Sequence, residues 1–182
     1  MFQDPYRSLN PRRTVGEAII EGPLNFGVPR DVALERARQL MELVRMDASA
    51  LARYPHQFSG GQRQRICIAR ALAMEPELLV ADEAVSALDV SVQAQVIDLL
   101  ADLRDRLGLS YVFITHDLPV VRNFADRIVV MQNGRVVEDN DTATLFAAPQ
   151  AAYTRSLLSS TPHPKWEALD STSTPFERQG SR

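Results

Sequence analysis

The chain has 182 residues, of which 45% are hydrophobic and 24% are charged, and its formal net charge is −3 at pH 7. These values indicate an ordinary globular domain that is large enough to bury a hydrophobic core. The weakly acidic charge gives no reason to expect nucleic acid as the main partner, no apolar run approaches the roughly 18 residues of a membrane span, and the single cysteine, Cys67, excludes an internal disulfide.

The part of the chain before residue 59 is predicted to form a loop followed by short helices. Thr14 is followed three residues later by Glu17, which predicts a capping box at the start of a helix. The glycine and proline at 22–23 are expected to end that helix. Apolar residues at helical spacing predict a longer helix that starts near Pro29 or Asp31. A loop over 3–13, a turn over 48–53 and a linker that includes His56 complete this part.

The rest of the chain alternates predicted strands and helices. Short apolar runs at 78–83 and 110–115 predict strands that are buried on both faces. Helices are predicted over 63–74, 90–107, 118–125 and 142–147, and Asn133-Gly134 predicts a hairpin between strands at 127–131 and 135–138. This alternation indicates an α/β fold with a parallel core sheet. From about Ser159 onward, the composition predicts little order.

Two adjacent carboxylates, Asp82 and Glu83, follow the first apolar strand directly. In open α/β sheets, ligands bind at the carboxyl ends of the strands. Successive side chains of a strand point to opposite faces, so one carboxylate could reach a metal ion while the other faces a water molecule. Two solvated acids at the end of a strand are the alternative. His116 lies at the end of the next predicted strand, and by itself such a histidine is more often structural than functional.

A second candidate site is the segment Ser59-Gly60-Gly61-Gln62, which precedes a predicted helix. Glycines at the start of a helix let a phosphate approach the backbone, where unpaired N–H groups and the helix dipole favour an anion. A capped helix after a flexible turn is the alternative. Arg63, Arg65 and Arg70 on this helix are interpreted as a solvated and interface face, and Asp89 as the N-cap of the helix over 90–107.

In chain order, these motifs resemble those of the ATP-binding subunit of an ABC transporter. The resemblance covers residues 1 to about 158, and the stretches 3–11, 82–95 and 153–158 most resemble the ATPases of oligopeptide, dipeptide and related small-solute importers. It implies a P-loop NTPase fold of the ABC ATPase type, with a parallel core sheet and a helical subdomain. Phe58 stands before the signature segment where the family usually has leucine.

The resemblance also implies a role for each motif. Asp82 would hold Mg²⁺, Glu83 would act as the general base that polarises the attacking water, and His116 would contact the γ-phosphate. The segment Ser59, Gly60, Gly61 and Gln62 would be the signature motif that touches ATP held by the opposite subunit. Gln3 would be the Q-loop glutamine that senses Mg²⁺ and the γ-phosphate, and Asp89 the D-loop aspartate at the dimer interface.

One family motif is absent from these 182 residues, which contain no Gly-x-x-x-x-Gly-Lys-[Ser/Thr] loop. That loop cradles the phosphates of ATP and supplies a lysine to them. We therefore expect a partial fold without the P-loop strands, which exposes apolar sheet faces and hydrolyses no ATP alone. A non-catalytic remnant or split partner that offers its signature motif to another P-loop subunit is the alternative.

The remaining expectations follow from the same resemblance. The cofactors would be ATP and Mg²⁺. The partners would be a second ABC ATPase subunit, transmembrane permease subunits and, indirectly, a solute-binding protein, at the cytoplasmic face of the plasma (inner) membrane. The expected parts are a Q-loop at 1–13, a helical subdomain at 14–58, a catalytic part at 59–148 and a C-terminal extension at 149–182. A repair or translation ABC protein is disfavoured because large insertions and a second cassette are absent.

Overall fold

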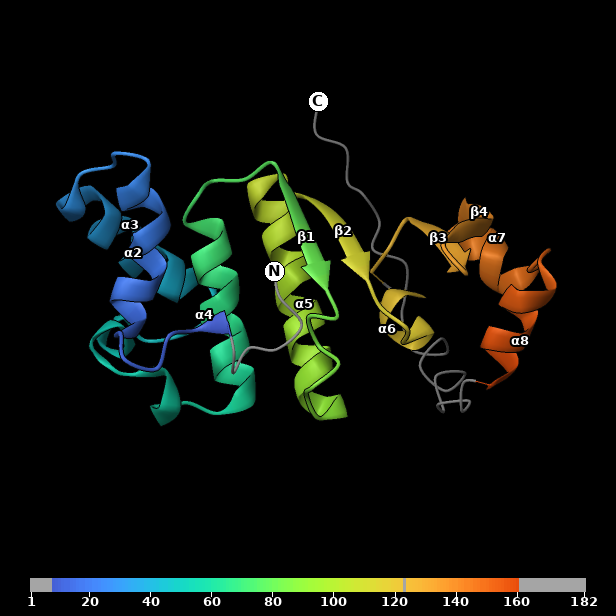
Figure 1. The fold of residues 1–182 in the computed structure, drawn as a ribbon, viewed down its shortest axis with the longest axis horizontal. Helices are drawn as coiled ribbons and strands as arrows, with labels where there is room; N and C mark the ends of the chain where they lie inside the picture. Colours follow the sequence, from blue (N-terminus) through green and yellow to red (C-terminus); the bar gives the residue numbers. More distant parts are fainter. Residues whose placement is uncertain (1–7, 123, 161–182) are drawn as a thin grey trace, which may run out of the picture. The chain divides into compact units, whose positions relative to one another are not determined.

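A computed structural model describes residues 8–122 and 124–160 of the chain (Figure 1). The chain divides into two compact units, with the boundary between Asp126 and Arg127. The first unit contains the helical part and a parallel strand pair, and the second contains a hairpin and two helices. The α/β fold class predicted from the sequence is confirmed.

The helix α2 (Val15–Asn25) begins with the predicted capping box. The Thr14 N–H donates to Glu17 Oε2 at 2.8 Å, and the Glu17 N–H donates to Thr14 Oγ1 at 3.3 Å. The predicted end at 22–23 is wrong, because the helix continues through Pro23 to Asn25. Near the end of a helix, proline removes only one hydrogen bond, and the Phe26 N–H still reaches the Gly22 and Pro23 carbonyls.

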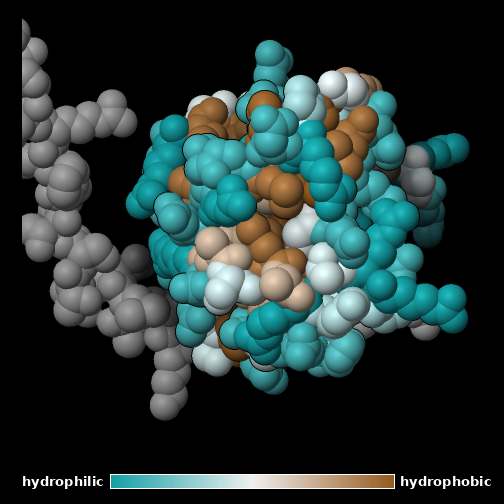
Figure 2. Space-filling model, turned by 90° about the vertical axis from the view of Figure 1, so that its left-hand side faces the viewer, coloured by the Kyte–Doolittle hydropathy of each residue, from teal (hydrophilic) through white to brown (hydrophobic). Residues whose placement is uncertain are grey.

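Two further helices complete the helical part of the first unit. The helix α3 (Arg30–Leu43) starts after Pro29, as predicted, and α4 (Gly60–Leu72) follows the short 3₁₀ segments η1 (Ala48–Ala52) and η2 (Pro55–Gln57). Both α2 and α3 pack against α4 and enclose apolar side chains, including Ile19, Met41 and Ile66. Figure 2 views this side of the molecule and shows an apolar area bordered by hydrophilic residues.

The parallel pair consists of β1 (Leu78–Asp82) and β2 (Ser110–Ile114), with Asp82 opposite Ile114. They are linked by α5 (Val90–Leu107), which ends at Gly108 in a left-handed conformation with φ of 65°. The helix α6 (Leu118–Arg122) follows β2 and is shorter than predicted. In Figure 1, α4 and α5 begin on the side of the unit toward which β1 and β2 point.

The prediction that these strands are buried on both faces is wrong. Leu79 and Ala81 are buried, but Leu78 and Val80 on the other face are 51% and 45% exposed. On the adjacent strand, Val112 and Ile114 are 46% and 49% exposed. Among the described residues, α5 and its neighbours pack on one face of this pair while the other face stays open, so apolar residues that would suit a covered sheet remain exposed.

The second unit is built on an antiparallel hairpin of β3 (Arg127–Gln132) and β4 (Arg135–Asp141). Asn133 and Gly134 both have positive φ, as the predicted hairpin turn requires. The helix α7 (Thr142–Ala147) lies where it was predicted. The helix α8 (Ala152–Ser160) was not predicted; the Glu138 carboxylate accepts hydrogen bonds at 2.9 Å from the N–H groups of Gln150 and Ala151, just before it.

Some predictions fall outside the described residues. These include the role of Gln3 and the order expected for residues 161–182. Within the described ranges, none of the helices combines the length and the apolar character that a membrane crossing requires.

Candidate functional site

The acidic end of β1 has an unusual backbone conformation. Asp82 is the last residue of the strand, and Glu83 has a positive φ of 47°, which residues other than glycine rarely adopt. The Glu83 N–H donates to the Ile114 carbonyl at 2.8 Å, and its carbonyl accepts from Ser86 Oγ at 3.0 Å. Such strain is held by surrounding bonds and is concentrated at functional sites in proteins.

The structure brings Glu83 and His116 together from the ends of the two parallel strands. Glu83 Oε1 lies 3.1 Å from His116 Nδ1, and the two side chains are 33% and 73% exposed, respectively. A carboxylate and an imidazole at this distance can jointly hold a water molecule or exchange a proton with a bound group. Both side chains remain open to a ligand.

The segment Ser59–Gln62 forms the N-terminal cap of α4. The Gln62 N–H donates to Ser59 Oγ at 3.4 Å, and the Ser59 N–H donates to Gln62 Oε1 at 3.0 Å. This reciprocal cap uses neither the hydroxyl proton of Ser59 nor the amide protons of Gln62. Both side chains are exposed, so these donors and the first N–H groups of the helix are available to an anion.

Gly61 is required for packing within the chain. A Cβ atom at this position would lie 2.5 Å from Val92 Cγ1, in the first turn of α5. The sequence suggested phosphate approach as the reason for this glycine, whereas the structure also requires it for the contact between α4 and α5. Asp89 occupies the predicted N-cap position of α5, but its carboxylate makes no side-chain cap hydrogen bond.

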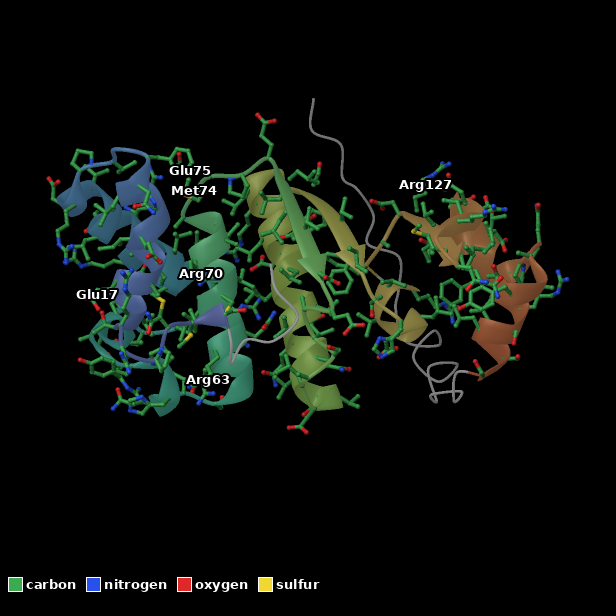
Figure 3. All side chains as sticks on the ribbon, in the orientation of Figure 1. Glu17, Arg63, Arg70, Met74, Glu75 and Arg127 are labelled. Carbon is green, nitrogen blue, oxygen red and sulfur yellow. The ribbon has the colours of Figure 1, made fainter. Side chains whose placement is uncertain are left out.

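The three arginines of α4 were interpreted as a solvated and interface face, and the solvated part of this interpretation is wrong, because each is partly buried and donates to a backbone carbonyl. Figure 3 labels two of them, Arg63 near the start of α4 and Arg70 further along. Burial lowers the pKa of the Arg65 guanidinium. The acceptors, for Arg63, Arg65 and Arg70 in turn, are the carbonyls of Pro55 (2.8 Å), Val44 (3.1 Å) and Ser8 (2.5 Å). Nothing in the sequence pattern distinguished these anchored arginines from exposed ones.

We call the ends of β1 and β2 that carry Asp82, Glu83 and His116 the acid edge. Its residues suit Mg²⁺ only when a bound ligand supplies further oxygen atoms. Asp82 offers a carboxylate, and Mg²⁺ is commonly held by one or two carboxylates together with phosphate oxygens and water. No cluster of three or more potential metal ligands occurs in the part of the chain that the structure describes. The donor chemistry therefore fits a metal ion that arrives with a phosphate.

A cavity of about 450 Å³ lies at the opposite end of the strands. Its lining includes Leu72, Glu77 and Leu109, and the last two immediately precede β1 and β2. Asp82 and Glu83 lie at the other ends of these strands, so this cavity is separate from the acid edge.

Comparisons with known proteins agree with one another. The family model described as ABC transporter matches residues 1–86. A peptide import ATP-binding protein of Brucella ovis is 53% identical over 169 residues, which cover 92% of this chain and 53% of that protein. The dipeptide transport ATP-binding protein DppF of Haemophilus influenzae is 54% identical over 164 residues, covering 89% and 50%. The chain thus spans about half the length of the curated relatives that it matches.

A solved structure shows the same fold. CbiO1 of Clostridium perfringens, described as part of the ABC transporter complex CbiONQ, superimposes with a TM-score of 0.73 at 29% sequence identity. The similarity covers 81% of this chain and 58% of that one.

Proposed function

We propose that the chain is part of an ATPase of the ABC transporter family that drives import of peptides or related small solutes, because it is 53% and 54% identical to ATP-binding proteins of peptide and dipeptide transport over 92% and 89% of its length. The proposal rests chiefly on one observation, the 3.1 Å contact between Glu83 and His116 at the ends of adjacent parallel strands. In this reading, the chain supplies the hydrolytic acid edge and the signature motif, and the P-loop comes from sequence outside these 182 residues.

Two side chains of the acid edge would take different roles in ATP hydrolysis. Glu83 accepts a proton from the water that attacks the γ-phosphorus, and ADP leaves as the bond to its terminal oxygen breaks. His116, which reaches the same carboxylate, donates a hydrogen bond to the γ-phosphate and keeps the water in line. Asp82, with Gln3 from the segment outside the described residues, would hold Mg²⁺, which neutralises charge that develops on the phosphate oxygens.

The signature segment would act across a dimer interface. Ser59 and Gln62 have free donors at the start of α4, and the exposed Asp89 carboxylate lies at the first turn of the neighbouring helix. These groups would contact ATP that is bound to the P-loop of a second ATPase subunit. ATP binding then draws the two subunits together, and hydrolysis lets them separate.

The helical part of the chain would contact the membrane partners. Residues 14–58 would form the helical subdomain that docks on transmembrane permease subunits, which places the protein at the cytoplasmic face of the plasma membrane. Support comes from Phe26 and Val32, which are 80% and 46% exposed near the connection between α2 and α3. Figure 2 shows an apolar area on this side of the molecule.

The test of the proposed function is a fused chain, in which a segment that carries a Gly-x-x-x-x-Gly-Lys-[Ser/Thr] loop, taken from a complete ABC ATPase subunit, precedes Met1 of this protein. The expected result is release of phosphate from Mg·ATP that depends on Glu83 and is absent from the 182-residue chain alone. Glu77→Gln, at the other end of β1, is the matched control and should leave the rate unchanged. A fused chain that binds ATP but shows the same rate with Glu83→Gln would contradict the role of the acid edge.

The alternative function, a partner that supplies only the signature motif, is favoured by the complete capping of Ser59–Gln62 within this chain. It predicts that the chain restores phosphate release to a complete ABC ATPase subunit whose own signature serine has been replaced. Ser59→Ala should abolish that rescue, and Glu83→Gln should not affect it.

A further inference from the structure

We propose that Arg53 is a positioning residue for the signature turn, defined as Ser59–Gln62. Its guanidinium fixes the segment that enters the turn, so that the donors of Ser59 and Gln62 are already aimed before ATP arrives. This inference rests on the proposed function of the turn, and it adds a residue outside the recognised motifs.

Arg53 holds the entering segment by two contacts. Its guanidinium carbon lies 4.4 Å from the centre of the Phe58 ring, and its Nη2 donates to the Gln57 carbonyl at 2.8 Å. Phe58 is 5% exposed and belongs to the hydrophobic core, so the ring is a fixed platform. A guanidinium that stacks on an aromatic ring while it donates in plane has little freedom left.

The same segment is also bound by Arg63. Its Nε donates to the Pro55 carbonyl at 2.8 Å. Between the two arginines, the Tyr54 N–H donates to Gln57 Oε1 at 2.8 Å. The backbone from Tyr54 to Phe58 is therefore held by bonds from both arginines immediately before the cap of α4.

The segment needs these ties because it has little regular structure of its own. Arg53 and Phe58 are both extended, and only the single 3₁₀ turn η2 lies between them. Phosphate recognition requires donors within a few tenths of an ångström of their places, which a loose loop does not provide. The aromatic ring at Phe58 is also what makes the stack with Arg53 possible, since leucine has no π face.

The first test measures local order by hydrogen exchange and mass spectrometry on the 182-residue chain. Arg53→Met should speed amide exchange over residues 54–62 by about tenfold, because a cation–π contact and a charge-assisted hydrogen bond are both lost. Phe58→Leu keeps an apolar side chain in the core and should give a smaller increase over the same residues. The control is Arg38→Met, since Arg38 pairs only with Glu35 on the exposed surface of α3 among its described contacts.

The second test measures phosphate release by the fused chain. Arg53→Met should raise KM for ATP several-fold and lower kcat little, and Arg53→Lys should restore part of the loss because it keeps the charge. Unchanged exchange over 54–62 in both Arg53→Met and Phe58→Leu would overturn the proposal, as would faster exchange with an unchanged KM. If the wild-type fused chain releases no phosphate, the proposed function fails, while the exchange result still decides whether Arg53 orders the turn.

Discussion

The signature turn and the acid edge lie on the same side of the first unit, but the chain supports them very differently. The turn is capped reciprocally by its own residues, and the arginines of its helix are anchored on backbone carbonyls. The acid edge stands at the end of a strand pair with one open face, where Val80 and Ile114 are 45% and 49% exposed. Glu83, the proposed general base, is held in a left-handed backbone conformation.

This difference indicates how much the order of each region depends on contacts with another protein surface. The local bonds of the signature turn are satisfied within these residues, so the turn can be ordered without a partner. The acid edge has its carboxylate and imidazole in place, but none of the described residues covers the apolar face next to it. A partner surface is therefore expected to change the burial and order of the acid edge more than those of the signature turn.

The largest predicted effect concerns the acid edge. In the fused chain, Glu83→Gln should lower the rate of phosphate release by about 10²- to 10⁴-fold, the usual contribution of a positioned general base. The amide keeps the size of the side chain and the backbone conformation, so the thermal unfolding temperature should stay within experimental error. A rate within a factor of two of the wild type would remove Glu83 from the chemistry.

The second prediction compares the two faces of the strand pair. Leu79→Thr places a hydroxyl on the buried face and should lower the free energy of unfolding by about 2–4 kcal/mol. Val80→Thr on the open face should change it by less than about 0.5 kcal/mol and should make the chain more soluble. Urea unfolding and the concentration at which the chain aggregates measure the two quantities. Equal destabilisation by both variants would mean that the second face is covered in solution.

The third prediction concerns the contact that joins the two regions. Gly61→Ala introduces a Cβ that would lie 2.5 Å from Val92 Cγ1. Because β-branched valine is stiff in a helix, α4 and α5 must move apart, which should cost about 1–3 kcal/mol of unfolding free energy. The better helix propensity of alanine offsets up to about 1 kcal/mol of this.

Adding Val92→Ala supplies the control for that experiment. The double variant should recover most of the loss measured for Gly61→Ala alone, since the clashing methyl group is gone. Urea unfolding of the single and double variants gives the coupling between the two sites. Additive effects would show that the glycine is needed for some other reason.

Local sequence signals predicted the helix caps and turns well, and they failed where burial depends on distant parts of the chain. The capping residues Thr14 and Ser59 and the turn at Asn133 are local patterns, and all three lie where they were predicted. The burial of a strand depends on what packs over it, so the apolar run at 78–82 wrongly predicted burial on both faces. The open face agrees instead with the expectation drawn from the missing P-loop motif, that apolar sheet faces would be exposed.

The candidate site shows the same division between local and distant information. The acid at 83 and the histidine at 116 were selected from the sequence, and the structure brings them to 3.1 Å, although their roles remain predictions. The anchored arginines were missed, because their acceptors are backbone carbonyls from other segments, such as that of Ser8, which lies 62 residues from Arg70. A carbonyl acceptor leaves no residue-type signal in the sequence.

The smallest predicted effect tests whether the stability of α2, which packs against the helix of the signature turn, depends on pH. The Thr14 N–H donates to the Glu17 carboxylate, which lowers the pKa of Glu17 below its ordinary value of 4.5. A lowered folded-state pKa means that the ionised cap stabilises α2 above about pH 4.5, and that this contribution is lost as the pH falls through the folded-state pKa. Glu17→Gln keeps an acceptor in the capping box but loses the charge at the helix N-terminus. The wild type should therefore unfold at a slightly higher temperature than the variant at pH 7, and the two unfolding temperatures should become equal near pH 3. Glu42→Gln, at the far end of α3, is the matched control for the removal of a carboxylate. Because α2 packs directly on α4, a pH-dependent loss of the first cap should also speed hydrogen exchange at the signature turn, and the exchange at β1 should respond less.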